Sequence, residues 1–208
     1  MASQLGFFFD ASACVGCKAC QLACKDINDL KVGTLYRRVY EMEGGTWRST
    51  GDGYAPQGVF AYHVALSCNH CANPVCVAVC PTGAMQKDPE NGVVWTDHDM
   101  CIGCRSCENA CPYHAPRFLE DKGYMGKCDF CRDELNAGRK PACTTVCAVR
   151  ALDYGDIDEL RVAHGEGNCL IEPLPDAGTD PQIVLIPHPQ APESGSGLAR
   201  ETSFDFEV

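Results

Sequence analysis

Four groups of four cysteines constrain this chain more than any other feature. Groups one and three both read C-x2-C-x2-C-x3-C, whereas groups two and four begin with C-x2-C and end with P-x-C-x3-C. In chain order the groups are Cys14, Cys17, Cys20 and Cys24; Cys68, Cys71, Cys76 and Cys80; Cys101, Cys104, Cys107 and Cys111; and Cys128, Cys131, Cys143 and Cys147. Two alternating spacings, each used twice, indicate an internal duplication.

The spacings are typical of iron–sulfur ligation. In a C-x2-C-x2-C-x3-C run, three closely spaced thiolates hold one [4Fe–4S] cluster and the fourth ligates a neighbouring cluster. Zinc is the main competing metal, but it would leave the third cysteine of each such run unused. A secreted disulfide scaffold is disfavoured because the N-terminal segment has neither the basic nor the long apolar region of a signal peptide. Sixteen soft ligands in four groups therefore predict four [4Fe–4S] clusters.

The segments between the groups suggest which of them share clusters. Residues 81–100 contain an Asn-Gly turn at 91–92 between apolar residues, so residues 58–118 resemble one complete small ferredoxin. Groups one and four then pair around it in a nested arrangement. The predicted ligand sets are Cys14, Cys17, Cys20 and Cys147; Cys128, Cys131, Cys143 and Cys24; Cys68, Cys71, Cys76 and Cys111; and Cys101, Cys104, Cys107 and Cys80. A tandem arrangement, with group one paired to two and three to four, stays open on spacing alone.

We expect an α+β fold of two nested bacterial-ferredoxin-like dicluster modules, with short antiparallel strands and with helices after the fourth cysteines. The outer module would comprise residues 1–57 and 119–170, and the inserted module residues 58–118. Residues 171–208 are rich in proline and contain one strand-like stretch, IVLI at 183–186. Such a segment cannot form a core of its own, and we expect an extended C-terminal arm that wraps a partner.

Composition excludes several other classes of protein. A formal net charge of −11 disfavours nucleic-acid binding, which needs a basic face. No apolar run approaches 18 residues, so no direct membrane span is predicted. The chain has no Ser/His/Asp set and no dinucleotide-binding fingerprint, which predicts an electron carrier without a catalytic site. His70 lies within the CNHC of group two, but all four cysteines of that group are kept, so we expect a packed histidine and not a ligand.

Single residues near the cysteines carry weaker expectations. Lys18, Lys25, Arg105 and Lys127 flank the cysteines, where a cation either raises a cluster's reduction potential or is simply solvated. Cys169, the one cysteine outside the groups, is expected to be a buried and inert thiol.

Several stretches resemble the electron-transfer (B) subunit of dimethyl sulfoxide reductase-type molybdoenzymes. They are GFFFDASACVGCKACQLACKDINDL, FAYHVALSCNHCANPVCVAVCPTGAMQK, CIGCRSCENACPYHAP and ALDYGDIDELRVAHG, within a resemblance that covers about residues 5–190. The resemblance favours the nested pairing and implies a four-iron centre at group three, because all four of its cysteines are present. Pro81 and Pro112 follow the last cysteine of groups two and three as in the family, whereas Lys25 and Ala148 stand there in groups one and four.

The resemblance also implies partners. One is a large catalytic subunit that carries molybdopterin, as the bis-guanine dinucleotide, and the other is an integral membrane anchor that oxidises quinol in anaerobic respiration. The cluster of Cys101, Cys104, Cys107 and Cys80 would lie nearest the membrane subunit, and that of Cys14, Cys17, Cys20 and Cys147 would face the catalytic subunit. The protein would then be peripheral to the cytoplasmic membrane without a signal peptide of its own, on the side set by its partner.

Three alternatives remain at this stage. A free polyferredoxin would shuttle electrons between soluble enzymes, and a zinc-stabilised module would mediate interactions without redox chemistry. The same subunit could also serve a thiosulfate-, polysulfide- or formate-type molybdoenzyme, because the substrate is chosen by a catalytic pocket that this chain does not contain.

Overall fold

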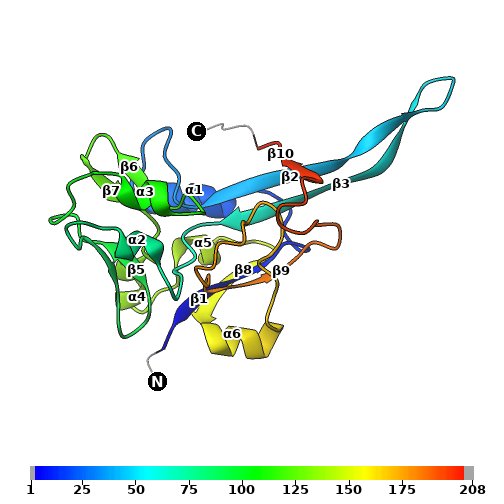
Figure 1. The fold of residues 1–208 in the computed structure, drawn as a ribbon. Helices are drawn as coiled ribbons and strands as arrows, with labels where there is room; N and C mark the ends of the chain where they lie inside the picture. Colours follow the sequence, from blue (N-terminus) through cyan, green and yellow to red (C-terminus); the bar gives the residue numbers. More distant parts are fainter. Residues whose placement is uncertain (1–2, 204–208) are drawn as a thin grey trace.

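The structure is a computed structural model that describes residues 3–203. These residues form four small β-sheets and six short helices, which agrees with the expected mixture of α and β elements. Figure 1 shows two groups of elements side by side, with a long hairpin of β2 and β3 that projects from the body. Within residues 3–203, no helix is long and apolar enough to cross a bilayer, since the longest, α1, has nine residues.

One group of elements contains cysteine groups two and three. Its elements, all short, are α2 (Val75–Ala78), β4 (Met85–Lys87), β5 (Val94–Thr96), α3 (Ser106–Ala110), β6 (Arg117–Leu119) and β7 (Tyr124–Gly126). β4 pairs antiparallel with β5 around the Asn91–Gly92 turn, as the sequence predicts. Gly92 has a φ of 70°, a left-handed conformation that suits glycine in such a turn. Met85 and Val94 point inward from this hairpin and are both buried.

The other group contains cysteine groups one and four. Its elements are β1 (Leu5–Asp10), α1 (Ala19–Ile27), β2 (Arg38–Ser49), β3 (Tyr54–Leu66), α4 (Arg132–Asn136), α5 (Ala142–Thr145), β8 (Leu152–Asp156) and α6 (Ile157–His164). β1 lies at the centre of a three-stranded sheet, antiparallel to β8 and parallel to β9 (Ile183–Ile186). Phe7 and Phe9 face the main core, whereas Phe8 lies on the opposite face with Ile157 and Leu160 of α6. The apolar run of β1 is therefore buried on both faces of the sheet.

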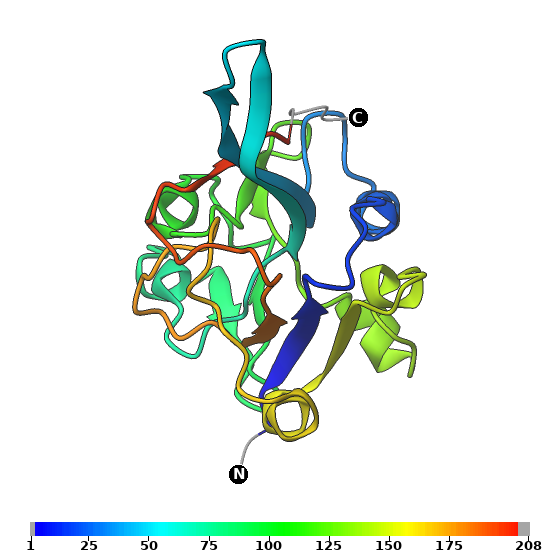
Figure 2. The ribbon, with the colours of Figure 1, turned by 90° about the vertical axis from the view of Figure 1, so that its right-hand side faces the viewer.

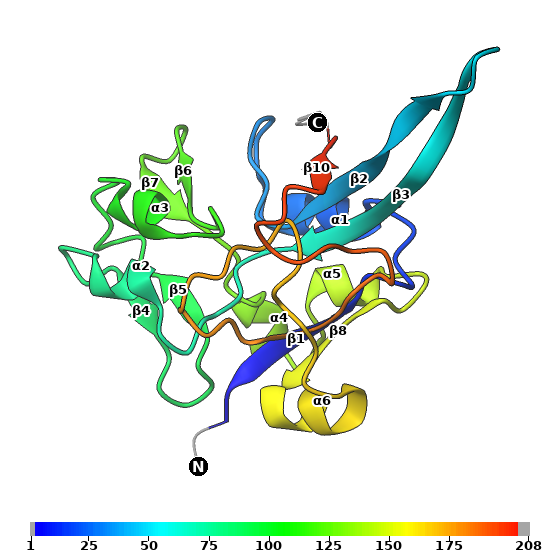
Figure 3. The ribbon, with the colours of Figure 1, turned by 45° about the vertical axis from the view of Figure 1, so that its right-hand side comes forward.

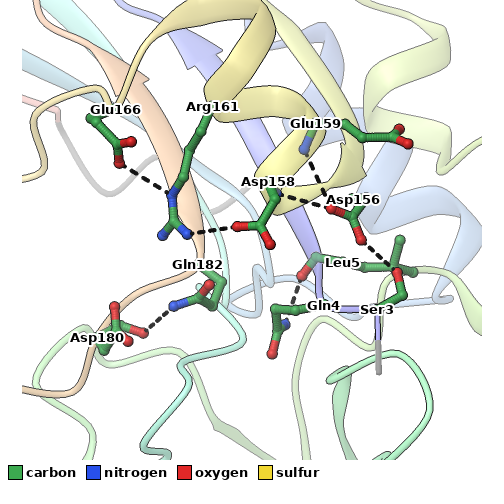
Figure 4. A network of polar contacts seen from close by, with 10 residues as sticks. All are labelled: Ser3, Gln4, Leu5, Asp156, Asp158, Glu159, Arg161, Glu166, Asp180 and Gln182. Atoms are coloured by element: carbon green, nitrogen blue, oxygen red, sulfur yellow. Dashed lines mark hydrogen bonds and ion pairs between the residues drawn. The ribbon is translucent and has the colours of Figure 1, made fainter. Parts of the chain in front are cut away.

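The N-terminus of α6 is held by a capping network, drawn in Figure 4. The Asp156 carboxylate accepts hydrogen bonds from the backbone N–H of Asp158 at 2.9 Å and of Glu159 at 3.3 Å. Ser3 donates a further hydrogen bond to it at 2.7 Å. The two backbone hydrogen bonds satisfy N–H groups that the first turn of a helix leaves unpaired. The hydrogen bond from Ser3, together with the backbone ones, lowers the pKa of Asp156.

The C-terminal segment differs from the predicted extended arm. As far as residue 203 it lies back across its own chain, as Figures 2 and 3 show. β9, which coincides with the strand-like IVLI stretch, joins the central sheet, and β10 (Ala199–Glu201) pairs antiparallel with β2. The segment has no core of its own, as expected, because its apolar residues complete the core of the preceding modules.

The helices lie elsewhere than predicted. Instead of following the fourth cysteines, α1, α2, α3 and α5 each contain the third cysteine of a group, and all but α1 end before the fourth. In α1 and α3 the helix begins after a left-handed residue, and in α2 and α5 it begins after a proline. The backbone at these positions starts the helix before the third cysteine, so the fourth lies at its far end.

Two of the predicted module boundaries fall inside paired strands. Residues 57 and 58 both lie in β3, which pairs with β2 along the projecting hairpin. Residues 118 and 119 both lie in β6, which pairs with β7. Each boundary therefore cuts a hairpin whose two strands are hydrogen-bonded to each other. The division into an outer and an inserted module stays a prediction.

Candidate functional site

Four cysteines from groups two and three line one cavity: Cys68, Cys71, Cys76 and Cys111. Cys76 lies in α2, and Cys111 directly follows α3. Burial raises the pKa of the Cys76 thiol to about 12 and that of Cys71 to about 11. Free thiols here would be neutral at pH 7, so an anionic sulfur in this cavity requires a bound metal to stabilise it.

The other four cysteines of the same two groups line a second cavity: Cys80, Cys101, Cys104 and Cys107. The backbone N–H groups of Met85 and Met125 donate to the sulfurs of Cys80 and Cys101, each at 3.4 Å. Burial raises the pKa of Cys80, but hydrogen bonds from Met85 and Thr82 outweigh it, so that the net pKa is lowered. Both hairpins, β4–β5 and β6–β7, therefore aim backbone donors at sulfur.

The four helices that contain cysteines pack against one another in two pairs. α2 packs against α3, and α1 packs against α5. Cys20 and Cys24 are one helical turn apart on α1, while Cys143 lies on α5 and Cys147 shortly after it. In α1 the four-residue spacing places Cys20 and Cys24 on one helix face at different heights, whereas the fourth cysteine of each other group lies just past its helix.

The cysteines of groups one and four come together in the same way. Burial raises the pKa of the Cys14 thiol, and the nearby thiols of Cys147 and Cys17 raise it further. Burial raises the pKa of Cys24 to about 12, with added contributions from Cys143 and Cys131. The structure therefore brings the start of group one to the end of group four, and the end of group one to the rest of group four.

The two C-x2-C-x2-C-x3-C groups share one backbone conformation. Gly16 and Lys18 have φ values of 67° and 60°, and the equivalent Gly103 and Arg105 have 66° and 62°. Left-handed turns of this kind occur in anion-binding nests of backbone N–H groups. Glycine is required at 103 for a second reason, because a Cβ there would lie 2.6 Å from the carbonyl oxygen of Gly123.

A second repeated feature follows the last cysteine of groups two, three and four. Gly83, His114 and Arg150 each donate a backbone hydrogen bond to the cysteine carbonyl three residues earlier, at 3.3, 3.1 and 3.1 Å. The turn forms with Pro81 or Pro112 after the cysteine and also with Ala148 in group four. Group one differs, because α1 continues through Lys25 to Ile27. The substitution at 148 thus leaves the local geometry intact, whereas that at 25 accompanies a longer helix.

Two buried cations lie at these sites. Lys127, which is 4% exposed, lines the first cavity and donates to the carbonyl oxygens of Val94 and Cys128. Arg37, which is 1% exposed, donates to Ala65 O and Ser67 Oγ, both at 3.0 Å. Burial lowers the pKa of Arg37, but the thiols led by Cys143 and Cys20 outweigh it and raise the net pKa.

The remaining cations that flank the cysteines are engaged elsewhere. Lys18 pairs with Glu41 at 3.0 Å, and the Lys25 ammonium donates to Lys31 O at 2.6 Å. The Arg105 guanidinium lies 4.2 Å from the centre of the Phe118 ring. Of the four cations that the sequence singles out, Lys127 is the one that is buried at a cavity. Arg37 was not predicted to lie at a cysteine site, because the only signal in the sequence is a pair of adjacent arginines beside an apolar strand.

His70 and Cys169 behave as packed residues. His70 is fully buried, its Nδ1 accepts a hydrogen bond from Val94 N–H at 2.9 Å, and its ring packs 4.7 Å from that of Phe130. His70 and Phe130 occupy equivalent positions in groups two and four. Cys169 is only partly buried, unlike the buried thiol predicted; it donates to Ile183 O at 3.4 Å, and burial raises its pKa to about 11.

The first cavity suits an anionic group. Asn69 lines it, and its Nδ2 is buried without a hydrogen-bond partner among residues 3–203. A buried donor without a partner is costly, and an anionic group rich in sulfur would accept its hydrogen bond.

Cysteines of neighbouring groups lie close enough to influence one another's pKa. Beyond the effect of burial, the thiols of Cys143 and Cys14 raise the pKa of Cys20, and those of Cys24 and Cys68 raise the pKa of Cys128. α2 and α3 then connect the cavity that Cys68 lines to the second cavity. At the two ends, Cys17 and Cys104 are the exposed cysteines of the seventeen. The apolar residues beside them, Val15 and Ile102, are 63% and 65% exposed.

Known proteins share this sequence along most of its length. The family model of a 4Fe-4S dicluster domain matches residues 59–157, and that of a 4Fe-4S binding domain matches residues 11–35. The chain is 50% identical over 196 residues to the B subunit of anaerobic dimethyl sulfoxide reductase of Escherichia coli, covering 94% of each protein. It is 48% identical over 193 residues to the corresponding B subunit of Haemophilus influenzae, covering 92% of this chain and 93% of the relative. A thiosulfate reductase electron transfer subunit of Salmonella typhi is 39% identical, over 80% of this chain and 83% of the relative.

Proposed function

This chain belongs to the family of iron–sulfur B subunits of dimethyl sulfoxide reductase, and we propose that it relays electrons through four [4Fe–4S] clusters to a molybdopterin-containing catalytic subunit. The electrons would come from a membrane subunit that oxidises quinol. The family establishes an iron–sulfur protein with several clusters. The number of clusters, their ligands and the partners are our proposal.

The proposed ligand sets are the nested ones. Two cavities, each lined by four cysteines of groups two and three, support two of the sets. The electrostatic contacts of Cys147 with Cys14, and of Cys24 with Cys131, support the two sets in groups one and four. The tandem alternative would bring group two to group one instead. When bound, each cluster would accept and return one electron at a time, and the sixteen thiolates of the four clusters would come from this chain alone.

The observation that carries the proposal is the exposure of one cysteine in each of two proposed ligand sets, which we place at the two ends of a linear order of four. Cys17 belongs to the first set and Cys104 to the last, while Cys68 and Cys128 between them are buried. A carrier that accepts electrons on one face and delivers them on another needs this arrangement. Burial of the inner sets would also keep them from reacting with solvent oxidants.

The family resemblance suggests which end meets which partner. We assign the Cys104 end to the membrane subunit and the Cys17 end to the catalytic subunit. Exposed apolar side chains at both ends, Ile102 and Val15, support a role in contacts with other chains. The protein would bind the cytoplasmic membrane peripherally, through the membrane subunit. This chain would itself have no catalytic role, and the terminal substrate would be selected in the catalytic subunit.

Dimethyl sulfoxide or a related oxide is the favoured substrate class for the complex. The dimethyl sulfoxide reductase B subunits are 48–50% identical to this chain, against 39% for the thiosulfate reductase subunit. A role in a thiosulfate-type complex is therefore the weaker candidate.

Anaerobic purification from detergent-solubilised native membranes tests the proposal. The tagged chain should bring down a large molybdenum-containing subunit and a hydrophobic subunit, with about 16 iron atoms per chain from four four-iron clusters. A brown chain that emerges alone with its clusters intact would instead be a free polyferredoxin. A colourless chain that contains zinc would rule out electron transfer altogether.

A further inference from the structure

The C-terminal segment lies directly against the loop of cysteine group two. Three backbone hydrogen bonds join them: Ala72 N–H to Asp180 O at 2.8 Å, Asn73 N–H to Thr179 O at 3.1 Å, and Gln182 N–H to Asn69 O at 2.9 Å. The segment before β9 is therefore held in register with the C-N-H-C loop that supplies Cys68 and Cys71. It forms part of the wall of the first cavity.

Thr179 is the residue of this segment that reaches sulfur. Its side chain is 7% exposed and lines the cavity, with Oγ1 at 3.4 Å from the Sγ of Cys71. On the other side, Oγ1 lies 2.9 Å from the phenolic oxygen of Tyr113. Tyr113 is two residues after Cys111, another cysteine of the same cavity. One hydroxyl thus connects two segments that each contribute to this wall.

The direction of these hydrogen bonds follows from the chemistry of a ligated cysteine. A cysteine bound to iron is a thiolate, which accepts hydrogen bonds and cannot donate them. The Thr179 O–H must then donate to Cys71, and its oxygen is left to accept from the Tyr113 O–H. The Tyr113 phenol is both a donor and an acceptor, so it can supply this proton. The result is a directed chain from Tyr113 through Thr179 to the sulfur.

We propose that Thr179 is a positioning residue that raises the reduction potential of the cluster held by Cys68, Cys71, Cys76 and Cys111, with Tyr113 orienting its hydroxyl. The inference rests on the proposed ligand set. A hydrogen bond to a ligand sulfur stabilises the added electron, because reduction increases the negative charge on sulfur.

Thr179 differs from the other hydroxyl groups near cysteine sulfurs in its distance along the sequence from the cysteine. Ser106 and Thr82, whose hydroxyls lie near Cys104 and Cys80 at the second cavity, are each two residues from the cysteine that they contact. Thr179 is 108 residues from Cys71. The C-terminal segment thus tunes a buried site whose cysteines all come from residues 68–111.

Thr179→Val, Thr179→Ser and Tyr113→Phe test the proposal in the complex purified anaerobically, by redox titration followed with EPR. Thr179→Val should lower the midpoint potential of one cluster and leave the other three unchanged. The shift should approach a tenfold change in the reduced-to-oxidised ratio, which is about 59 mV for one electron. Thr179→Ser keeps the hydroxyl and should retain the potential, and Tyr113→Phe should shift the same cluster in the same direction by less.

Thr202→Val is the matched control. Thr202 lies in the same C-terminal segment, but its hydroxyl donates to Glu41 O, so its loss should move no potential. Unchanged potentials in both Thr179→Val and Tyr113→Phe would overturn the inference. If Thr179→Val loses iron, Tyr113→Phe decides, because it leaves the cavity wall in place. Wild-type protein without four-iron signals would instead refute the proposed ligation, which iron and sulfide analysis detects independently.

Discussion

Replacement of the buried Arg37 by methionine should lower both the stability of the protein and the potentials of the clusters in the outer module. The Arg37 guanidinium is close to cysteines of both outer-module sets, of which Cys143, Cys20 and Cys128 raise its pKa most. It also lies 4.6 Å from the centre of the Phe7 ring in the core. Methionine fills a similar volume without a charge or a donor.

The expected loss of stability follows from two hydrogen bonds. Arg37 donates to Ala65 O and to Ser67 Oγ, each at 3.0 Å in a dry environment. Hydrogen bonds from a charged group contribute about 1.5–3 kcal/mol each, and part of this is recovered because methionine need not be desolvated. We expect a net loss of about 3 kcal/mol, or a thermal midpoint lower by about 6–12 °C for a chain of this size.

The expected change in potential follows from the charge. A unit charge 4 Å from a sulfur contributes about 4 kcal/mol at an effective dielectric constant of about 20, which corresponds to roughly 170 mV for one electron. The side-chain hydrogen bonds of Arg37 go to oxygen atoms and not to sulfur. The expected fall is therefore smaller, on the order of 50–150 mV.

EPR-monitored redox titration and thermal unfolding of the purified complex, both under anaerobic conditions, measure the two effects. Arg37→Lys keeps the charge but loses the planar fork, so it should lose stability and retain most of the potential. Arg38→Met removes a charge from the neighbouring, less buried position and should change little. Cluster potentials that stay at wild-type values in Arg37→Met would refute the electrostatic reasoning, whatever happens to the thermal midpoint.

Three further outcomes are expected. Cys76→Ser and Cys111→Ser should each abolish the same EPR-detected cluster, whereas Cys107→Ser should abolish a different one; loss of different clusters from the first two would favour the tandem arrangement. Removal of iron by a chelator should unfold the chain, because its core is built around the cysteines, and an unchanged circular dichroism spectrum after chelation would contradict this. Asp156→Ala should destabilise α6 by about 1 kcal/mol, measured by hydrogen exchange, and Asp156→Asn should preserve the cap; equal exchange rates in both variants would exclude a role for the cap.

Features that depend on neighbouring residues were predictable. The β4–β5 hairpin forms at its Asn-Gly turn, and the IVLI stretch forms a strand, as the sequence indicates. The cysteines of groups two and three line two cavities, four to each, and the assignment of these sets as cluster ligands stays a prediction. Turn geometry and ligand spacing are local properties of the chain, so they leave a repeated pattern in the sequence.

The positions of the helices were not predicted correctly. The left-handed residues Lys18 and Arg105 start α1 and α3 before the third cysteine of their groups, although neither residue type favours that conformation. The backbone strain at these two residues is consistent with a cysteine loop that turns tightly around a proposed metal site.

The sequence by itself determined an iron–sulfur protein with several clusters, because sixteen thiols at duplicated spacings have few other uses. Only the tertiary structure decided what surrounds those thiols. Arg37 and Thr179 come from segments outside the cysteine groups, and their roles depend on burial and on contacts between distant parts of the chain. The C-terminal segment returns to its own modules because β1 and β2 each have an edge free to pair with it. Such long-range pairing has no periodic signature, so it becomes visible only when the chain is folded.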